Sequence, residues 1–364
     1  MRVLVTGHQG YIGAVMVPLL IQEGHEVVGL DTGLFEGCSF PFGSTVTIPA
    51  IRRDLRDVTP EDVSGFDAVV HLANISNDPI GNLNPDLTFE VNHRATVRLA
   101  ELSREAGVKR FLFSSSCSLY GAAGDAPLTE EAAFNPVTPY GEAKVLAERD
   151  ISALACDGFS PTHMRNATAY GMSPRLRFDL VLNNLVAWAV TTGQIYMKSD
   201  GSPWRPIVHI RDISQAFACV LRAPVEDVHN QAFNVGRSEE NYRIREIAEA
   251  VGQVVPGCEV AFADDASPDK RSYQVNFDKI RTVLPDFRPE WTARKGAAEV
   301  YAALRQAELT PEDFEGRRYR RIKHLLGLME AGRLTTDLRW TPERADRAAH
   351  RPKPRVHTRR RTTS

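Results

Sequence analysis

The start of the chain constrains the fold most strongly. Residues 3–5 are an apolar run that predicts a short buried strand, and residues 14–21 are an apolar stretch that predicts a helix. Between them stand three spaced glycines, Gly7, Gly10 and Gly13. Glycines at this spacing allow a tight turn and a close approach of the backbone, and the helix start offers free N–H groups to an anion. The segment therefore predicts a seat for the pyrophosphate of a dinucleotide.

A second strand is expected over residues 26–30, and it ends in Asp31. A carboxylate at this place can accept hydrogen bonds from the adenosine ribose hydroxyls, and its charge disfavours a 2′-phosphate. The cofactor predicted from these residues is NAD rather than its phosphorylated form.

The following pattern alternates between strands and helices. Further strands are predicted over residues 66–73, 110–114 and 161–166, and helices over residues 86–106 and from residue 139 onwards. This alternation predicts an α/β fold, a Rossmann doubly wound parallel sheet with a smaller C-terminal α/β substrate-binding cap. We expect residues 1–166 to form the NAD-binding domain, with later segments returning to it, and residues 167–340 to form mainly the substrate-binding domain.

The charge of the chain is unevenly distributed. The 364 residues have a net charge of −2, but residues 341–364 hold eight Lys or Arg and two Asp or Glu, so this tail carries +6 and the rest carries −8. The tail has no apolar periodicity, which predicts a disordered, solvated segment. Contact with nucleic acid is the less favoured alternative, because no aromatic residues for base stacking accompany the arginines.

The five cysteines lie far apart, with no C-x-x-C pair and no metal-ligand spacing. This usage predicts a reducing, cytoplasmic environment and no bound metal. A strand that starts at residue 2 leaves no room for a signal peptide, and no apolar run has the length of a bilayer span, so no membrane partner is expected.

Tyr140 and Lys144 stand four residues apart in a predicted helix, and therefore on one face of it. A lysine ammonium close to a phenol stabilises the phenolate, and a positive nicotinamide ring adds to this. The pair predicts a base that takes a proton from a substrate hydroxyl near neutral pH.

The strand at residues 110–114 opens into a serine-rich run at its carboxyl end, where parallel sheets bind ligands. Ser116 is predicted to hydrogen-bond the reacting hydroxyl and to pass its proton to Tyr140. Cys117 and Ser118 come next and are also expected at the substrate. For Ser114, a cofactor contact and a turn-capping role both remain open.

With these motifs in order, the chain resembles an extended short-chain dehydrogenase/reductase of the NAD-dependent sugar-nucleotide epimerase/dehydratase family. The resemblance runs from Met1 to about Trp291 and rests on T-G-x-x-G-x-x-G, D-L-R-D, H-L-A, S-S-S-x-x-x-Y-G, P-Y-G-x-x-K and R-P-x-V-H-I-x-D. It implies that NAD is the cofactor, that a nucleotide-diphosphate sugar is the partner, and that the protein is a homodimer.

The resemblance also implies roles for single residues. The cofactor would contact Gly7, Gly10, Tyr11, Ile12 and Gly13 through its pyrophosphate, Asp31 through its adenosine ribose, Asp54 and Leu55 through its adenine, and Leu72, Ala73, Asn74, Asn92, Ser114, Tyr140 and Lys144 on its nicotinamide side. The substrate would contact Asn166 in the cleft, and Asn184, Leu185, Arg205 and Arg271 through its diphosphate. Paired arginines suit a diphosphate because each offers a planar fork of donors.

The loop after the H-L-A strand is rich in short polar side chains. Ser76, Asn77 and Asp78 are placed either to read sugar hydroxyls or to cap turns. A sugar larger than a common hexose, such as a heptose, is compatible with this loop.

Two departures from the family pattern bear on the reaction. Dehydratases and decarboxylases of the family place acidic residues where this chain has Cys117 and Ser118. C3/C5 epimerases place a cysteine two residues before the tyrosine, whereas Cys117 stands three residues before it. In a strand, this offset would turn the thiol away. The sequence therefore predicts an NAD-dependent nucleotide-sugar 4-epimerase that acts through a 4-keto intermediate. An NDP-4-keto-sugar reductase, a C3/C5 epimerase and a catalytically silent SDR-fold binding protein stay open as alternatives.

Overall fold

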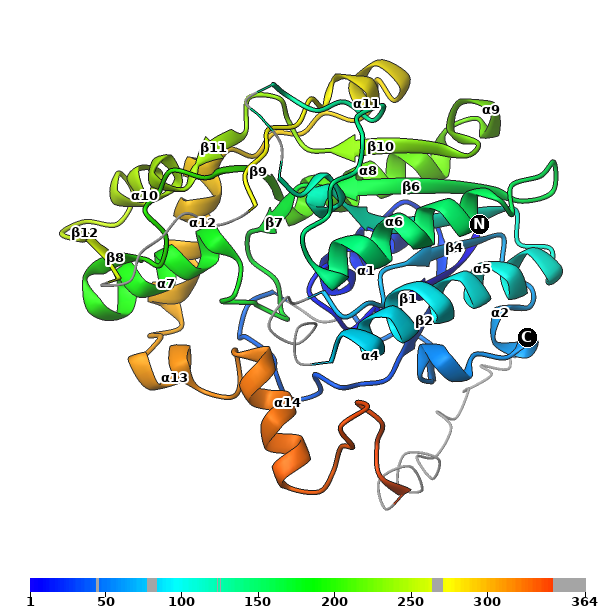
Figure 1. Ribbon diagram of the computed structural model, residues 1–364. Helices are drawn as coiled ribbons and strands as arrows, with labels where there is room; N and C mark the ends of the chain where they lie inside the picture. The colour runs from blue at the N-terminus through cyan, green and yellow to red at the C-terminus, as the bar shows by residue number, and fades with distance from the viewer. Residues whose placement is uncertain (44–45, 77–83, 123, 125, 264–270, 343–364) are drawn as a thin grey trace, which may run out of the picture.

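The computed structural model describes residues 1–43, 46–76, 84–122, 124, 126–263 and 271–342 (Figure 1). Asn77 and Asp78, two of the predicted sugar contacts, lie outside the described residues. The basic tail from residue 343 onwards also lies outside them.

A seven-stranded parallel sheet forms the centre of the molecule, with the strand order β10-β6-β5-β4-β1-β2-β3. Its strands are β1 (Arg2–Thr6), β2 (Glu26–Asp31), β3 (Ala50–Arg52), β4 (Ala68–His71), β5 (Arg110–Ser116), β6 (Ser160–Asn166) and β10 (Gln231–Val235). The predicted α/β class with a Rossmann-like parallel sheet is confirmed. Because all strands run the same way, their carboxyl ends meet at one edge of the sheet, which is where such sheets bind ligands.

Helices cover both faces of this sheet, because side chains of a strand alternate between the faces. Val3 and Val5 pack with α1 (Gly13–Gln22), α8 (Ile210–Arg222) and α11 (Asp278–Val283), whereas Leu4 packs on the opposite face with α2 (Pro60–Val63), α5 (Thr96–Glu105) and α6 (Pro139–Ser152). Both α8 and β10 come from the second half of the chain, so that half returns to the central sheet.

The long helix predicted over residues 86–106 is interrupted by a π-helical turn. It consists of α4 (Pro85–Phe89), the π-helical segment η2 (Glu90–Ala95) and α5. Asn92 lies in this wider turn, and its side-chain amide both accepts a hydrogen bond from Ile75 N at 2.7 Å and donates one to Ile75 O at 2.9 Å. The turn thereby fixes the backbone that leaves β4, and π-helical turns often accompany functional sites for such reasons.

The second half of the chain also builds a separate core beside the sheet. A three-stranded sheet holds β7 (Thr168–Tyr170), β9 (Trp204–His209) and β11 (Asn241–Arg243), and a two-stranded sheet holds β8 (Gln194–Met197) and β12 (Glu259–Phe262). Helices α7 (Val181–Thr192), α10 (Ile244–Gly252), α12 (Ala293–Gln306) and α13 (Pro311–Glu315) pack around them, and α9 (Val225–Val228) precedes β10. None of the helices in the described ranges has the length and apolar character needed to span a membrane.

After α13 the chain returns to the first half of the molecule. We call residues 317–342, which include α14 (Arg321–Glu330), the C-terminal strap. Its leucines at 325, 328, 334 and 338 pack on Leu87 of α4, and in Figure 1 α14 (orange) lies close to α4. The sequence analysis did not predict this contact.

A buried ion pair fixes α6 to the sheet. Glu148 of α6 and Arg165 of β6 are joined by contacts of 2.7 to 3.1 Å, and both side chains are 6% exposed. Ser115 Oγ donates to Glu148 at 2.5 Å, and Arg165 donates to Tyr120 Oη at 3.1 Å and to Glu130 O at 2.8 Å. Every polar group of the pair thus has a partner, as a buried charge requires.

We expect Glu148→Gln to lower the free energy of unfolding by about 3 kcal/mol, because removing one partner leaves the Arg165 charge buried without compensation. The shift of the urea unfolding midpoint measures this loss. Glu26→Gln is the matched control, since Glu26 is 70% exposed and its pair with Arg2 should contribute less than about 1 kcal/mol. Equal losses in the two variants would contradict the prediction.

Candidate active site

The glycines of the turn after β1 stand at positions that have no room for a side chain. Gly7 has φ +72°, and a Cβ there would lie 2.8 Å from Ala73 N, while a Cβ on Gly13 would lie 2.5 Å from Gly7 O. Within the described part of the chain, no side chain caps the start of α1. The turn therefore presents bare backbone and the N-terminus of a ten-residue helix, which fits the pyrophosphate of NAD.

Tyr11 and Ile12 sit in this turn, but their side chains face the protein. The Tyr11 hydroxyl donates to Gly171 O at 2.6 Å and accepts from Asn183 Nδ2 at 3.2 Å. Burial raises the pKa of Tyr11. Ile12 is partly buried and packs on both main core clusters. The predicted pyrophosphate contacts of these two residues would thus come from their backbone.

Asp31, at the carboxyl end of β2, is held in place by the backbone around it. Gln9 N donates to Asp31 Oδ2 at 3.1 Å, and Gly33 N donates to Asp31 Oδ1 at 2.8 Å. Each carboxylate oxygen keeps a further lone pair, so the group fits two ribose hydroxyls.

The two residues predicted beside adenine are committed to other contacts. Asp54 caps the short helix η1 (Leu55–Asp57) by accepting from Arg56 N at 2.9 Å, and it pairs with the Arg56 guanidinium at 2.9 and 2.7 Å. Leu55 is 5% exposed and belongs to the core beneath the sheet. Their side chains therefore stabilise the segment next to the predicted adenosine site through contacts within the protein.

Lys144 joins three pieces of the site. It is 1% exposed, and its ammonium donates to Ser114 O at 2.5 Å and to Asn74 Oδ1 at 3.0 Å. The nitrogen lies 5.6 Å from the centre of the Tyr140 ring and 4.4 Å from that of Phe113. Burial lowers the pKa of Lys144 to about 7. Leu72 and Ala73 lead into Asn74 and lie against Gly7, so the predicted nicotinamide-side residues come together here.

The serine run at the end of β5 turns into the short helix η3 (Cys117–Tyr120). Ser116 caps this helix, since its Oγ accepts from Ser118 N at 3.1 Å and donates to Ser118 Oγ at 3.1 Å. Asn166 Nδ2 donates to Ser114 Oγ at 3.1 Å, and Asn166 Oδ1 has no partner within the described part of the chain. Hydroxyl and amide groups thus line the ends of β5 and β6.

Cys117 does not face this polar edge. The residue is fully buried, its Sγ donates to Arg165 O at 3.1 Å, and burial raises the pKa of the thiol. The short helix directs the side chain into the core, so we withdraw the predicted substrate contact of Cys117.

The two predicted diphosphate arginines lie together. Arg205 of β9 donates to the backbone carbonyl of Arg271, and its guanidinium carbon is 5.8 Å from the Tyr273 ring centre. Burial raises the pKa of Tyr273 to about 12, although a hydrogen bond with Ser118 and the charges of Arg205 and Arg271 act to lower it. This cluster connects the arginines to the serine run.

Asn184 and Leu185 of α7, the other predicted diphosphate contacts, make contacts within the protein. Asn184 Nδ2 donates to Phe178 O at 2.7 Å, and Leu185 is 3% exposed within the second core. Neighbouring Asn183 is fully buried instead and donates to the Tyr11 hydroxyl and, at 3.1 Å, to Arg177 O. The structure thus uses Asn183 to tie α7 to the glycine turn, a role that the sequence pattern did not reveal.

Arg177 is the other residue that the sequence analysis missed. Its guanidinium donates to Ser76 Oγ at 3.1 Å and to Ser76 O at 3.0 Å, and it pairs with Asp179 at 3.0 and 2.6 Å. The predicted sugar contact Ser76 is therefore held by an arginine. Asn183 Nδ2 also donates to both Arg177 O and the Tyr11 hydroxyl, which places the Arg177 backbone beside the glycine turn.

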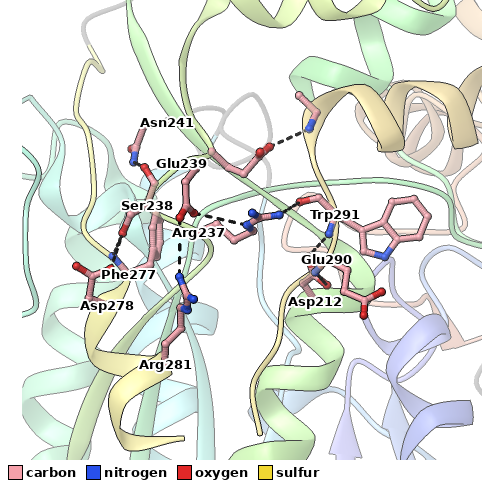
Figure 2. Close-up of polar contacts among 12 residues, drawn as sticks. Asp212, Arg237, Ser238, Glu239, Asn241, Phe277, Asp278, Arg281, Glu290 and Trp291 are labelled. Carbon is pink, nitrogen blue, oxygen red and sulfur yellow. Dashed lines mark hydrogen bonds and ion pairs between the residues drawn. The ribbon is translucent and has the colours of Figure 1, made fainter. Parts of the chain in front are cut away.

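A depression of about 610 Å³ lies beyond the end of β10, and none of the site residues described above lines it. Figure 2 shows how its charges are paired: Glu239 lies 3.6 Å from Arg237 and 3.8 Å from Arg281, and Arg237 donates to Trp291 O at 3.4 Å. Asp212 accepts from the backbone N–H groups of Glu290 and Trp291. These contacts connect β10, α8 and the segment before α12, which is a structural role.

The comparisons agree with this geometry. The family model described as "NAD dependent epimerase/dehydratase family" matches residues 3–236. The UDP-glucose 4-epimerase of Mycolicibacterium smegmatis is 30% identical over 320 residues, which are 84% of this chain and 99% of that protein. UDP-glucuronic acid decarboxylase 1 of Arabidopsis thaliana is 26% identical over 326 residues, 87% of this chain and 72% of that protein.

Among solved structures, MoeE5 in complex with UDP-glucuronic acid and NAD is similar, with a TM-score of 0.72 and 27% identity. The match covers 84% of this chain and all of that one. NAD is therefore the cofactor, as predicted from the glycine turn and Asp31. The extent of these matches shows that the chain belongs to the NAD-dependent epimerase/dehydratase family of extended short-chain dehydrogenases/reductases.

Proposed function

We propose that this protein is an NAD-dependent nucleotide-sugar 4-epimerase. The observation that carries the proposal is the end of β5, where the cap made by Ser116 and Ser118 lies against α6, the helix of Tyr140 and Lys144, and where Cys117 is buried. This edge offers hydroxyls for proton relay, and the positions of Cys117 and Ser118 supply neither a carboxylate nor an accessible thiol. Several UDP-glucose 4-epimerases resemble this chain, including that of Mycolicibacterium smegmatis, which supports the same reaction.

In the proposed mechanism Tyr140 is the base. Its phenolate accepts the proton of the sugar C4 hydroxyl through Ser116, and it returns a proton when the C4 hydroxyl is formed again. Bound NAD supplies the hydride acceptor and donor for this carbon. Between the two transfers the 4-keto sugar turns about its diphosphate bonds to present its other face.

Lys144 stabilises the phenolate by its charge and by its position. Its two hydrogen bonds go to neutral oxygens, Ser114 O and Asn74 Oδ1, so no carboxylate competes with Tyr140 for the ammonium at these contacts. Arg205 and Arg271 hold the substrate diphosphate in this proposal, because Arg205 bonds the Arg271 backbone and both charges act on Tyr273 beside Ser118. The diphosphate is thus the fixed point around which the sugar turns.

The reaction is tested with purified protein, NAD⁺ and a panel of UDP-, dTDP-, GDP- and ADP-sugars in D2O. We expect inversion at C4 with no deuterium on carbon, because the hydride returns internally, and Cys117→Ala should give the same product. Carbon-bound deuterium beside the ketone would mean C3/C5 epimerisation, and loss of water or carbon dioxide would mean elimination or decarboxylation. Turnover only with NADH and a 4-keto sugar would mean a reductase. Each of these results would overturn the proposal.

Tyr140→Phe should lower kcat by about 100- to 10,000-fold, which is the usual contribution of a positioned acid–base group. The ring and its packing on Lys144 are kept, so the thermal midpoint and the NAD content should not change. Tyr196→Phe serves as the control, because Tyr196 packs on Trp188 in the second core and should retain full activity. Activity of Tyr140→Phe near that of the unchanged protein would exclude Tyr140 as the base.

Stability should depend on pH through Lys144. Burial puts the pKa of Lys144 in the folded protein at about 7, below its unfolded value of about 10.4, so the unfolded chain binds more protons between these pH values. The contribution of Lys144 to the free energy of unfolding therefore rises as pH increases from 7 to 10. We expect the NAD-free protein to gain stability relative to Lys144→Met across this range in urea titrations. A difference that is constant with pH would show that the ammonium is not desolvated.

A further inference from the structure

The C-terminal strap lies beyond residues 3–236, the part that matches the family model. It covers the segment that directly follows Asp31. Trp340 Nε1 donates to Thr32 O at 2.8 Å, and His324 Nε2 donates to Leu34 O at 2.9 Å. Leu34, Phe35 and Ile75 pack on the leucines of the strap. The strap therefore closes over the adenosine end of the dinucleotide site from the opposite end of the chain.

Arg321 is the first residue of α14 and lies on the segment that follows Asp31. Its guanidinium lies over the Phe35 ring, 4.1 Å from the ring centre. The side chain is partly buried, and within the described ranges it has no hydrogen bond or ion pair. A guanidinium carries five donors, so this placement leaves a strong anion-binding group without an anion.

The charges around Arg321 locate it along the cofactor site. Asp31 and Asp179 attract it, and Arg177 repels it. Asp31 marks the adenosine ribose, whereas Arg177 lies close to Tyr11 of the glycine turn and to Tyr140. Arg321 lies over Phe35, four residues after Asp31, and thus on the side of the site where the diphosphate leaves the adenosine ribose.

The local charge balance also calls for an anion. Asp179 is bound bidentately by Arg177, and no carboxylate within the described residues forms an ion pair with Arg321. Burial and the Arg177 charge together lower the pKa of Arg321 to about 9. A bound diphosphate would compensate the Arg321 charge, and charge-assisted hydrogen bonds of this kind are strong.

We propose that Arg321 is a cofactor-binding residue that contacts the diphosphate of NAD, opposite the glycine turn, and so makes the C-terminal strap the closure of the adenosine half of the site. The inference rests on NAD as the cofactor and not on which sugar is epimerised. A strap that grips NAD suits a reaction in which the cofactor is regenerated at every turnover.

The test uses the full-length Arg321→Gln variant freed of NAD, with binding measured by calorimetry. NAD⁺ and ADP should bind about tenfold more weakly or worse, because each loses a charge-assisted contact, whereas adenosine and UDP should bind as before. Arg321→Lys should lie between the variant and the unchanged protein, since it keeps the charge but loses the planar fork. The thermal midpoint without ligand should not fall, because the substitution removes an uncompensated charge.

Arg317→Gln is the matched control. Arg317 is in the same strap, is 66% exposed and pairs with Glu330, so its substitution should leave the affinity for NAD⁺ and ADP unchanged. Unchanged NAD⁺ and ADP affinity in Arg321→Gln would overturn the proposal. An equal loss for adenosine would reduce the role of Arg321 to packing, and a loss confined to UDP would assign it to the substrate; both results also overturn the proposal. Since no step measures turnover, the outcome is independent of the epimerase proposal.

Discussion

The site depends on a single buried ammonium. Lys144 Nζ donates to the last part of β5 through Ser114 O and to the loop after β4 through Asn74 Oδ1, while its own backbone belongs to α6. One charged group thus sets the spacing of two neighbouring strand ends and the helix that carries Tyr140. Burying an ammonium is costly, and the lowered pKa of Lys144 reports this cost. Such an arrangement persists only if the surrounding elements are held independently.

That independent support lies one turn further along α6. Glu148 stands four residues after Lys144 and is locked to Arg165 of β6, which in turn reaches Tyr120 and Glu130. The pair fixes the helix against the sheet with groups that take no part in the chemistry. Asn92 does the same for the loop after β4 by bonding both backbone groups of Ile75. The Glu148–Arg165 ion pair and the Asn92 amide therefore both help to preorganise Lys144.

The sequence predicts those parts of the site whose requirements are local. Gly7 and Gly13 are recognisable because only glycine fits a backbone that approaches within 3 Å of other atoms, and Tyr140 and Lys144 because four residues make one helical turn. Arg177 and Asn183 could not be found in this way, since their partners Ser76 and Tyr11 are 101 and 172 residues away. Cys117 was predicted at the substrate because it follows the serine run, whereas its offset from the tyrosine indicated that the thiol turns away, and η3 does direct the thiol into the core.

The C-terminal strap also depends on a contact between residues that are far apart in the sequence. Trp340 meets Thr32 across 308 residues, so the docked strap joins the last described part of the chain to the segment that follows β2. A contact of such long range costs loop-closure entropy and gains little from packing a few leucines alone. Any ligand that binds between the glycine turn and α14 stabilises the docked strap by mass action, and a docked strap in turn slows the release of that ligand. In this proposal, the binding of NAD and the docking of the strap are thermodynamically linked.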